Sequence, residues 1–243
     1  WRKGKLFGFM LLAGILLMAK PALADSYYPY EIQGYDVTVK VGKDNVYHVT
    51  ERLQVNFNQA RHGIYRDIPV INNVSREDGS TSRIQARVTN IKTYGEKKTV
   101  GREGSYCRIQ LGDKNKTLVG EHMYHISYDY NMGKDVRKGE DEFYYNIIGT
   151  SWDTTIQNVT FHIMMPEDID ESKVGMAYGE SGSTNNEGLQ YTINGKVMEG
   201  YVDPSIILNP GEAVTVRMVL PDGYYDQVKQ RIWPALISIL LSL

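Results

Sequence analysis

The residues of this chain that could carry chemistry are its histidines and its acidic clusters. His122 and His125 lie three residues apart in HMYH, a spacing that sends them to opposite faces of a strand and is poor for one shared metal ion. The run 140–142 gathers three carboxylates before an aromatic segment. A glycosidase needs two carboxylates at a set separation around a sugar, whereas adjacent acids at a turn are more typical of a solvated loop.

Other catalytic patterns do not fit the sequence. It contains neither the spacing of an activated serine nor a phosphate loop or dinucleotide fingerprint. Cys107 is the single cysteine, so no internal disulfide can form, and its strand-like surroundings predict a small buried side chain. We therefore predict no catalytic residue, no metal site and no cofactor. A formal charge of −2 offers no basic surface for nucleic acid.

The elements that position these residues are predicted to be strands. From Asp25 to about Asp226, apolar residues recur with a period of two, and no long segment with a helical period appears. YDVTVKV and VYHVTERLQVNF, separated by the turn GKDN, predict a β-hairpin. Further strands are expected at residues 83–91, 122–130, 157–166 and 212–221. The fold class is therefore all-β: an antiparallel β-sandwich, immunoglobulin-like or larger, built as one unit or as two packed sub-sandwiches.

Two charged residues interrupt apolar faces of these strands. In VYHVTERLQVNF, Glu51 stands among Tyr47, Val49, Leu53, Val55 and Phe57. In RHGIYRDIPV, Arg66 stands between Ile64 and Ile68 on one face.

A lone charge that faces a core is costly, but two opposite charges can offset each other. We therefore predict a buried or half-buried structural ion pair between Glu51 and Arg66, across adjacent strands. A guanidinium suits this role because its planar fork binds a carboxylate with two hydrogen bonds. The alternative is a bulge that turns Arg66 toward solvent.

The first 24 residues are typical of a secretory signal peptide. Arg2, Lys3 and Lys5 are followed by an apolar stretch over residues 6–19 and by the small-residue pattern Ala22-x-Ala24. We expect a signal helix over residues 1–24 with cleavage before Asp25, and an uncleaved anchor is the alternative.

The last segment, residues 229–243, ends in WPALISILLSL. A spanning helix needs about 20 apolar residues, so this segment is expected to be the start of a transmembrane helix, and a short amphipathic end is the alternative. These signals together predict a membrane-attached protein whose main domain, residues 25–226, lies outside the cytoplasm.

Tyrosines flank the predicted domain at both ends. The stretches SYYPYEIQGY and DGYYD contain Tyr27, Tyr28, Tyr30, Tyr224 and Tyr225. Exposed tyrosines could bind a glycan or a protein partner, and the alternative is that they cover sheet edges or lie near a membrane surface. We treat these five as a candidate binding surface.

Three stretches of the sequence resemble a known family. VYHVTERLQVNFNQARHGIYRDIPV, DEFYYNIIGTSWDTTIQNVTFHIMMP and LNPGEAVTVRMVLPDGYY are similar to the extracytoplasmic N-terminal domain of the domain-of-unknown-function 2207 family of bacterial membrane proteins. The resemblance covers about residues 27–225. It implies a signal peptide, a β-rich domain and a following transmembrane segment, and it supplies no catalytic residues.

Three functions remain open from the sequence. The first is a membrane-anchored binding or scaffolding module that contacts an envelope protein or polysaccharide. The second is an envelope enzyme that acts on glycans through an acidic cleft. The third is a structural spacer.

Overall fold

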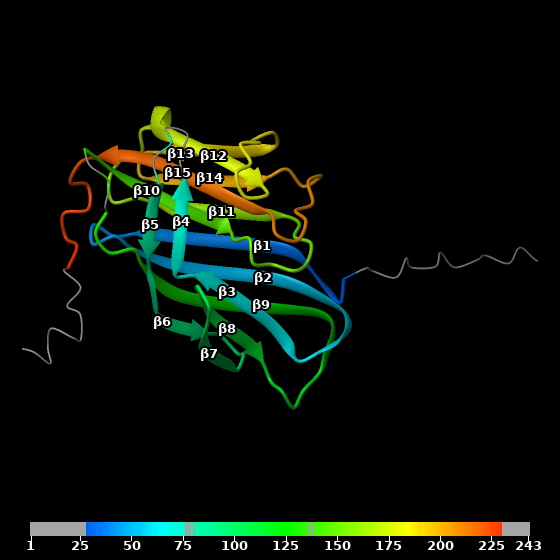
Figure 1. Cartoon of the computed structure of the whole chain (residues 1–243). Coiled ribbons are helices and arrows are strands. Elements are labelled where there is room, and N and C mark those ends of the chain that lie inside the picture. The colour runs from blue at the N-terminus through cyan, green and yellow to red at the C-terminus, as the bar shows by residue number, and fades with distance from the viewer. Residues whose placement is uncertain (1–27, 76–78, 80, 136, 138, 230–243) are drawn as a thin grey trace, which may run out of the picture.

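The computed structural model describes residues 28–75, 79, 81–135, 137 and 139–229 (Figure 1). The predicted signal helix and the predicted start of a transmembrane helix lie outside the described residues. Within them the only helix is one 3-10 turn, η1 (Glu171–Lys173), and no described helix has the length and apolar character to cross a membrane. The all-β prediction is confirmed.

Seven strands form the largest sheet, in the order β13-β14-β11-β1-β2-β9-β6. Their bounds are β1 (Tyr30–Val41), β2 (Val46–Arg61), β6 (Arg87–Thr93), β9 (Leu118–Asn131), β11 (Val159–Met164), β13 (Leu189–Asn194) and β14 (Val197–Val202). The predicted β1–β2 hairpin is present, with Val39 opposite Val49 and Val41 opposite Tyr47. Long strands β1, β2 and β9 lie side by side through the middle of the molecule (Figure 1).

Two three-stranded sheets and one two-stranded sheet complete the fold. Their orders are β10-β15-β12, β3-β8-β7 and β4-β5. The bounds are β3 (Gly63–Pro69), β4 (Ile71–Ser75), β5 (Thr81–Gln85), β7 (Lys98–Glu103), β8 (Tyr106–Gly112), β10 (Glu140–Ile148), β12 (Val174–Gly179) and β15 (Ala213–Pro221).

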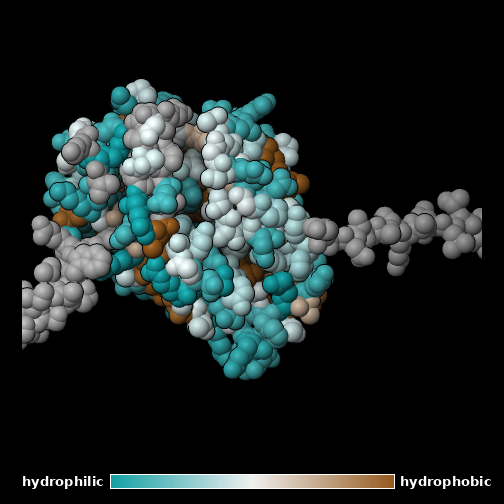
Figure 2. Space-filling view, in the orientation of Figure 1, coloured by the Kyte–Doolittle hydropathy of each residue, from teal (hydrophilic) through white to brown (hydrophobic). Residues whose placement is uncertain are grey.

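One continuous core joins the large sheet to the two three-stranded sheets. The inward residues of β1, β2 and β9 alternate with polar residues, as the two-residue period predicts. They pack against β3, β8, β10 and β15; Tyr47, for example, lies 5.1 Å from Phe143 between ring centroids. This layered packing is consistent with a β-sandwich. The face shown in Figure 2 is mainly hydrophilic, with apolar residues in separate small patches.

Two details of the predicted sandwich are wrong. The sheet is mixed, because β1 pairs with β11 in parallel, with Val37 opposite Phe161. The predicted strand at 83–91 is divided into β5 and β6, because Ala86 is buried at the corner and its amide donates to Val70 instead of continuing either ladder. A period of two reports which face is buried and carries no information on strand direction or partner.

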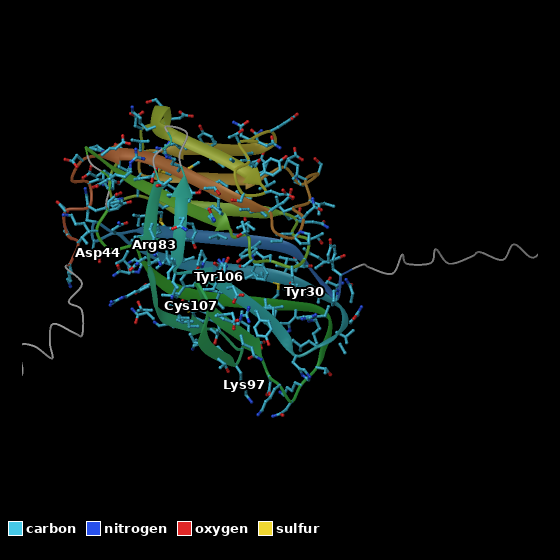
Figure 3. The ribbon with its side chains drawn as sticks, in the orientation of Figure 1. Tyr30, Asp44, Arg83, Lys97, Tyr106 and Cys107 are labelled. Atoms are coloured by element: carbon cyan, nitrogen blue, oxygen red, sulfur yellow. The ribbon has the colours of Figure 1, made fainter. Side chains whose placement is uncertain are left out.

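The described chain enters and leaves at opposite ends of the large sheet. Tyr30 begins β1, while Gln227 donates a backbone hydrogen bond to the carbonyl of Lys43, in the turn after β1. Tyr30 and Asp44 accordingly lie at opposite sides of the domain in Figure 3.

Candidate functional site

Glu51 and Arg66 meet in the core with bidentate geometry. The Nε atom of Arg66 donates to Oε2 of Glu51 at 2.8 Å, and Nη2 donates to Oε1 at 2.8 Å. The exposed fraction is 0% for Glu51 and 2% for Arg66, so bulk solvent screens neither charge. Nη1 of Arg66 donates to the carbonyl of Asp67 at 2.8 Å. The arginine between two isoleucines is therefore buried with its charge balanced and its fork satisfied.

The expectation that this pair crosses adjacent strands is wrong. Both edges of β2 are already paired, with β1 and with β9, so β3 cannot join it. The chain instead bends at His62 and Gly63, and β3 pairs with β8 in another sheet. Glu51 and Arg66 therefore connect two layers of the sandwich rather than two neighbours within one sheet.

Two tyrosine hydroxyls complete the shell of the Glu51 carboxylate. Tyr128 donates to Oε1 at 2.6 Å and Tyr35 donates to Oε2 at 2.8 Å. Each carboxylate oxygen thus accepts two hydrogen bonds, which fills its usual capacity. Because the one proton of Tyr128 points to Glu51, the hydroxyl of Tyr145, 2.9 Å away, is the donor to Tyr128.

The surroundings of Glu51 and Arg66 favour the charged form of both side chains. Burial by itself raises the pKa of Glu51, but the Arg66 guanidinium and the hydrogen bonds from Arg66, Tyr128 and Tyr35 outweigh it, so the pKa of Glu51 is lowered. Burial tends to lower the pKa of Arg66, and the Glu51 carboxylate more than reverses this, so the pKa of Arg66 is raised. Burial and the Glu51 charge also raise the pKa of Tyr128. The cluster is a fixed ion pair rather than a proton-exchanging site.

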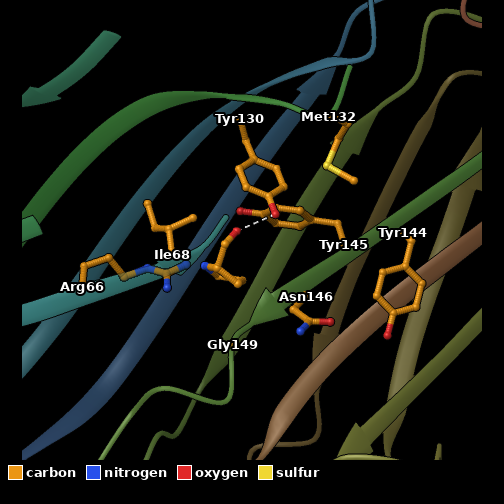
Figure 4. A pocket seen from close by; sticks show the side chains of 9 residues that line it. Arg66, Ile68, Tyr130, Met132, Tyr144, Tyr145, Asn146 and Gly149 are labelled. Carbon is orange, nitrogen blue, oxygen red and sulfur yellow. Dashed lines mark hydrogen bonds between the residues drawn. The ribbon is translucent and has the colours of Figure 1, made fainter. Parts of the chain in front are cut away.

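Aromatic residues pack around the Arg66 guanidinium. The guanidinium carbon of Arg66 lies 5.7 Å from the ring centroid of Trp152, and the Trp152 ring meets Tyr35 edge to face. A cavity of about 30 Å³ lies beside the guanidinium, between Arg66, Tyr145, Asn146 and Gly149 (Figure 4). That volume has room for roughly one or two water molecules and is too small for a substrate.

The predicted tyrosine surface is wrong for three of its members. Tyr30, Tyr224 and Tyr225 are buried, with exposed fractions of 4%, 5% and 7%. Tyr30 packs at the start of β1 and donates to Asp153, whereas Lys43 lies 4.3 Å above the ring of Tyr224 at the opposite end. These residues therefore stabilise the two ends of the sheet. Tyr28 is half-buried and Tyr27 lies outside the described residues.

The other candidate groups are held apart or neutralised. His122 contacts Glu96 at 2.7 Å, while His125 stacks on Tyr94 on the opposite face of β9.

Glu142 accepts hydrogen bonds from Arg137 at 2.9 Å and Arg217 at 2.6 Å. Asp141 accepts the amide of Tyr225, and Glu140 pairs with Arg137. The acidic run therefore lies at the start of β10, where Asp141 and Glu142 are only 8% and 6% exposed, so the expectation of a solvated loop is wrong. Cys107 is half-buried rather than fully buried. Among the described residues, no cluster of three possible metal ligands forms.

A polar groove of about 400 Å³ lies on the outward face of the seven-stranded sheet. Gly34 forms part of its floor, since it places no side chain there. The remaining lining residues come from β1, β2, β9, β11 and the turn before β11: Tyr35, Asp36, Thr38, Arg52, Gln54, Met123, Asn158, Thr160 and His162. A volume of this size is in the range of ligand sites.

The groove offers hydrogen-bonding groups and no activated nucleophile. Thr160 donates to Asp36 at 2.9 Å, so its hydroxyl is directed to a carboxylate rather than to a base that would remove its proton. His162 lies 3.7 Å from Asp36 and 3.4 Å from Glu199. Within the described residues, the Arg52 guanidinium has no hydrogen-bond or ion-pair partner. The arrangement is suited to binding a polar ligand.

The sequence profile of a family described as "predicted membrane protein (DUF2207) N-terminal domain" matches residues 31–220. This chain belongs to that family. The match spans the strands that hold both the ion pair and the groove, from β1 to β15.

Other comparisons show a distant likeness only. No curated protein matches the chain. An M1 zinc metallopeptidase from Deinococcus radiodurans is 9% identical with a TM-score of 0.40, over 77% of this chain and 42% of that chain. Native leukotriene A4 hydrolase from Saccharomyces cerevisiae is 6% identical with a TM-score of 0.43, over 80% of this chain and 30% of that chain. This chain therefore spans less than half the length of either structure, and similarity at this level carries no functional argument.

Sequence reasoning missed most residues of the groove. Residue alternation in YDVTVKV places Asp36 and Thr38 on the polar face of that strand, but nothing in the sequence aligns them with Arg52 or Thr160. One signal was available in the sequence: Met123 falls on the polar side of HMYHISYDY. The structure leaves this residue 61% exposed. An apolar residue on a face that is otherwise polar often marks a contact surface.

Proposed function

We propose that this protein is a membrane-associated, extracytoplasmic binding module of the bacterial cell envelope, and that its ligand surface is the groove on the outward face of the seven-stranded sheet. The groove is the observation that carries this proposal, because it combines hydrogen-bonding side chains, the exposed Met123 and Arg52, whose guanidinium has no partner in the described part of the chain. The family description supports membrane association. The signal-like pattern of residues 1–24 supports the extracytoplasmic side.

The groove is tested by binding of the purified chain to isolated envelope fragments in a co-sedimentation assay. Arg52→Glu places a carboxylate in the centre of the groove beside Asp36 and should reduce binding severalfold. Lys98→Glu makes the same charge change on exposed β7, in the β3-β8-β7 sheet, and should leave binding unchanged. Equal binding by the two variants would refute the groove as the ligand surface.

The side of the membrane requires a separate measurement. Cells that produce the full chain are converted to spheroplasts and treated with a protease. An extracytoplasmic domain is digested while a cytoplasmic marker protein stays intact. Protection of the domain equal to that of the marker would place it on the other side.

A spacer is a second candidate, favoured by the opposite positions of Tyr30 and Gln227 on the large sheet. The 12 residues of β1 set a separation of about 35 Å between these ends. A spacer would show no specific binding by the groove, so the co-sedimentation assay also separates the two. The glycan-hydrolysing alternative lacks support in the groove, whose lining includes one carboxylate, Asp36, where hydrolysis uses two.

A further inference from the structure

A row of side chains crosses the outward face of the large sheet at right angles to the strands. Strand register places Tyr201 opposite Thr160, Thr160 opposite Asp36, Asp36 opposite Arg52 and Arg52 opposite His125. The row then reaches Tyr94, whose amide donates to the carbonyl of His125 and whose ring stacks on the His125 ring at 4.1 Å. We call these six residues the cross-strand row.

The two ends of the row are exposed aromatic rings. The exposed fraction is 46% for Tyr201 and 56% for Tyr94. Five strand spacings separate them, which gives a length of about 24 Å. Asp36, Arg52 and Thr160 line the groove in the middle of the row. Rings at both ends and hydrogen-bonding groups between them form an elongated site.

The six residues of the cross-strand row carry no net charge when His125 is neutral. Asp36 and Arg52 carry opposite signs, and burial together with the Arg52 charge lowers the pKa of His125, which favours its neutral form. A neutral imidazole can both donate and accept a hydrogen bond. A carboxylate, a guanidinium, a hydroxyl and an imidazole together suit ligands rich in hydroxyl groups, and they give no net attraction to a polyanion.

A protein strand is a poorer fit to this surface. Five of the six residues lie on internal strands, whose backbone groups are already paired on both sides, so strand addition at an edge cannot use them. Protein interfaces usually bury an apolar centre, whereas the centre of this row is polar. The ring faces of tyrosine can instead cover the apolar face of a sugar while their hydroxyls stay in water.

On the basis of the proposed groove function, we infer that the ligand is an uncharged or weakly charged polysaccharide segment that lies across the strands from Tyr94 to Tyr201. One pyranose unit of an extended chain is about as long as one strand spacing, so the row accommodates roughly five units. Affinity should therefore rise with chain length to about that size and then level off.

The test uses the full chain and envelope fragments in three forms: untreated, digested with protease, and oxidised with periodate, which cleaves the vicinal diols of sugars. Binding should survive digestion with protease and be lost after oxidation. Tyr94→Ala and Tyr201→Ala should each weaken binding to the protease-digested fragments by roughly tenfold. Tyr65→Ala is the matched control, because Tyr65 is 50% exposed on β3, outside the row, and binding should not change.

The outcomes separate this inference from the groove function. Binding that is lost with protease, survives periodate and still depends on Arg52 would overturn the polysaccharide and keep the groove. Binding to sugars that Tyr94→Ala and Tyr201→Ala leave unchanged would overturn the row. The absence of binding to any fragment would refute both the inference and the proposed function. Melting temperatures equal to that of the unmodified chain check that the exposed variants fold.

Discussion

Gly63 and Gly112 lie opposite each other on the first rung of the β3–β8 ladder, and neither has room for a side chain. A Cβ atom on Gly63 would lie 1.8 Å from the carbonyl oxygen of Leu111, and one on Gly112 would lie 2.0 Å from that of His62. Both have positive φ, 131° and 133°, where side chains are strained. This glycine pair lets the chain bend out of β2 and brings Arg66 back over Glu51.

Substitution of Gly63 should therefore be costly. Backbone strain costs about 1–3 kcal/mol, and the overlap with Leu111 adds to it, so Gly63→Ala should lower the free energy of unfolding by at least about 2 kcal/mol. Urea denaturation measures this value. Gly101→Ala on β7 of the same sheet is the control, because a Cβ atom there meets nothing within 4 Å. A similar small effect for both variants would show that the bend does not need glycine.

The Glu51–Arg66 pair should show strong coupling in a double-mutant cycle. Glu51→Gln and Arg66→Gln each leave one buried charge without a counter-charge, which typically costs about 3–5 kcal/mol. The double variant removes both charges and should lose much less than the sum of the two single losses. Denaturation curves of the four proteins give the coupling energy. Additive losses would mean that the contact contributes little beyond its separate parts.

The pair should also make stability depend on pH. The pKa of Glu51 is lower in the folded chain than its ordinary value of 4.5, so its contribution is complete above pH 4.5 and is lost as the pH falls through the folded pKa. The stability difference between the unmodified chain and Glu51→Gln should thus be largest near neutral pH and shrink in acid. Urea midpoints from pH 7 to pH 3 test this. A difference that grows in acid would show that the sign of the shift is reversed.

The tyrosine hydroxyls around Glu51 should differ in importance. Tyr128→Phe removes a donor to the carboxylate and also leaves the buried hydroxyl of Tyr145 without its acceptor. Such losses cost roughly 1–3 kcal/mol. Tyr145→Phe removes a donor to Tyr128 but leaves the Glu51 shell complete, so it should cost less. Thermal or urea unfolding ranks the two variants, and a larger loss for Tyr145→Phe would contradict the assigned direction of the hydrogen bond.

Much of the core could be predicted from residue alternation. The alternation in YDVTVKV places Tyr35, Val37, Val39 and Val41 on one face of a strand, and all four are buried. Glu51 lies in phase with the apolar residues on one face of its strand. This pattern can be recognised in the sequence without knowledge of the fold.

Other features could not be read from the sequence because they depend on contacts between distant segments. The bend at Gly63 moves β3 out of the sheet of β2, and local patterning does not reveal where a glycine will take positive φ. Tyr224 lies near the end of the predicted domain, yet it is buried as part of the hydrophobic core, with Lys43 above its ring. The cross-strand row exists only after the register of six strands is set, and a shift of one residue in β11 would turn Thr160 to the core.

The opposite positions of Tyr30 and Gln227 have a mechanical consequence. Tension applied to the described domain through its two ends runs along the strands of the large sheet, so it loads many ladder hydrogen bonds of β1 at the same time. A pull across the strands would instead open such bonds one after another. The domain should resist stretching along this axis more than across it, and single-molecule force measurements with two pulling directions would reveal the difference.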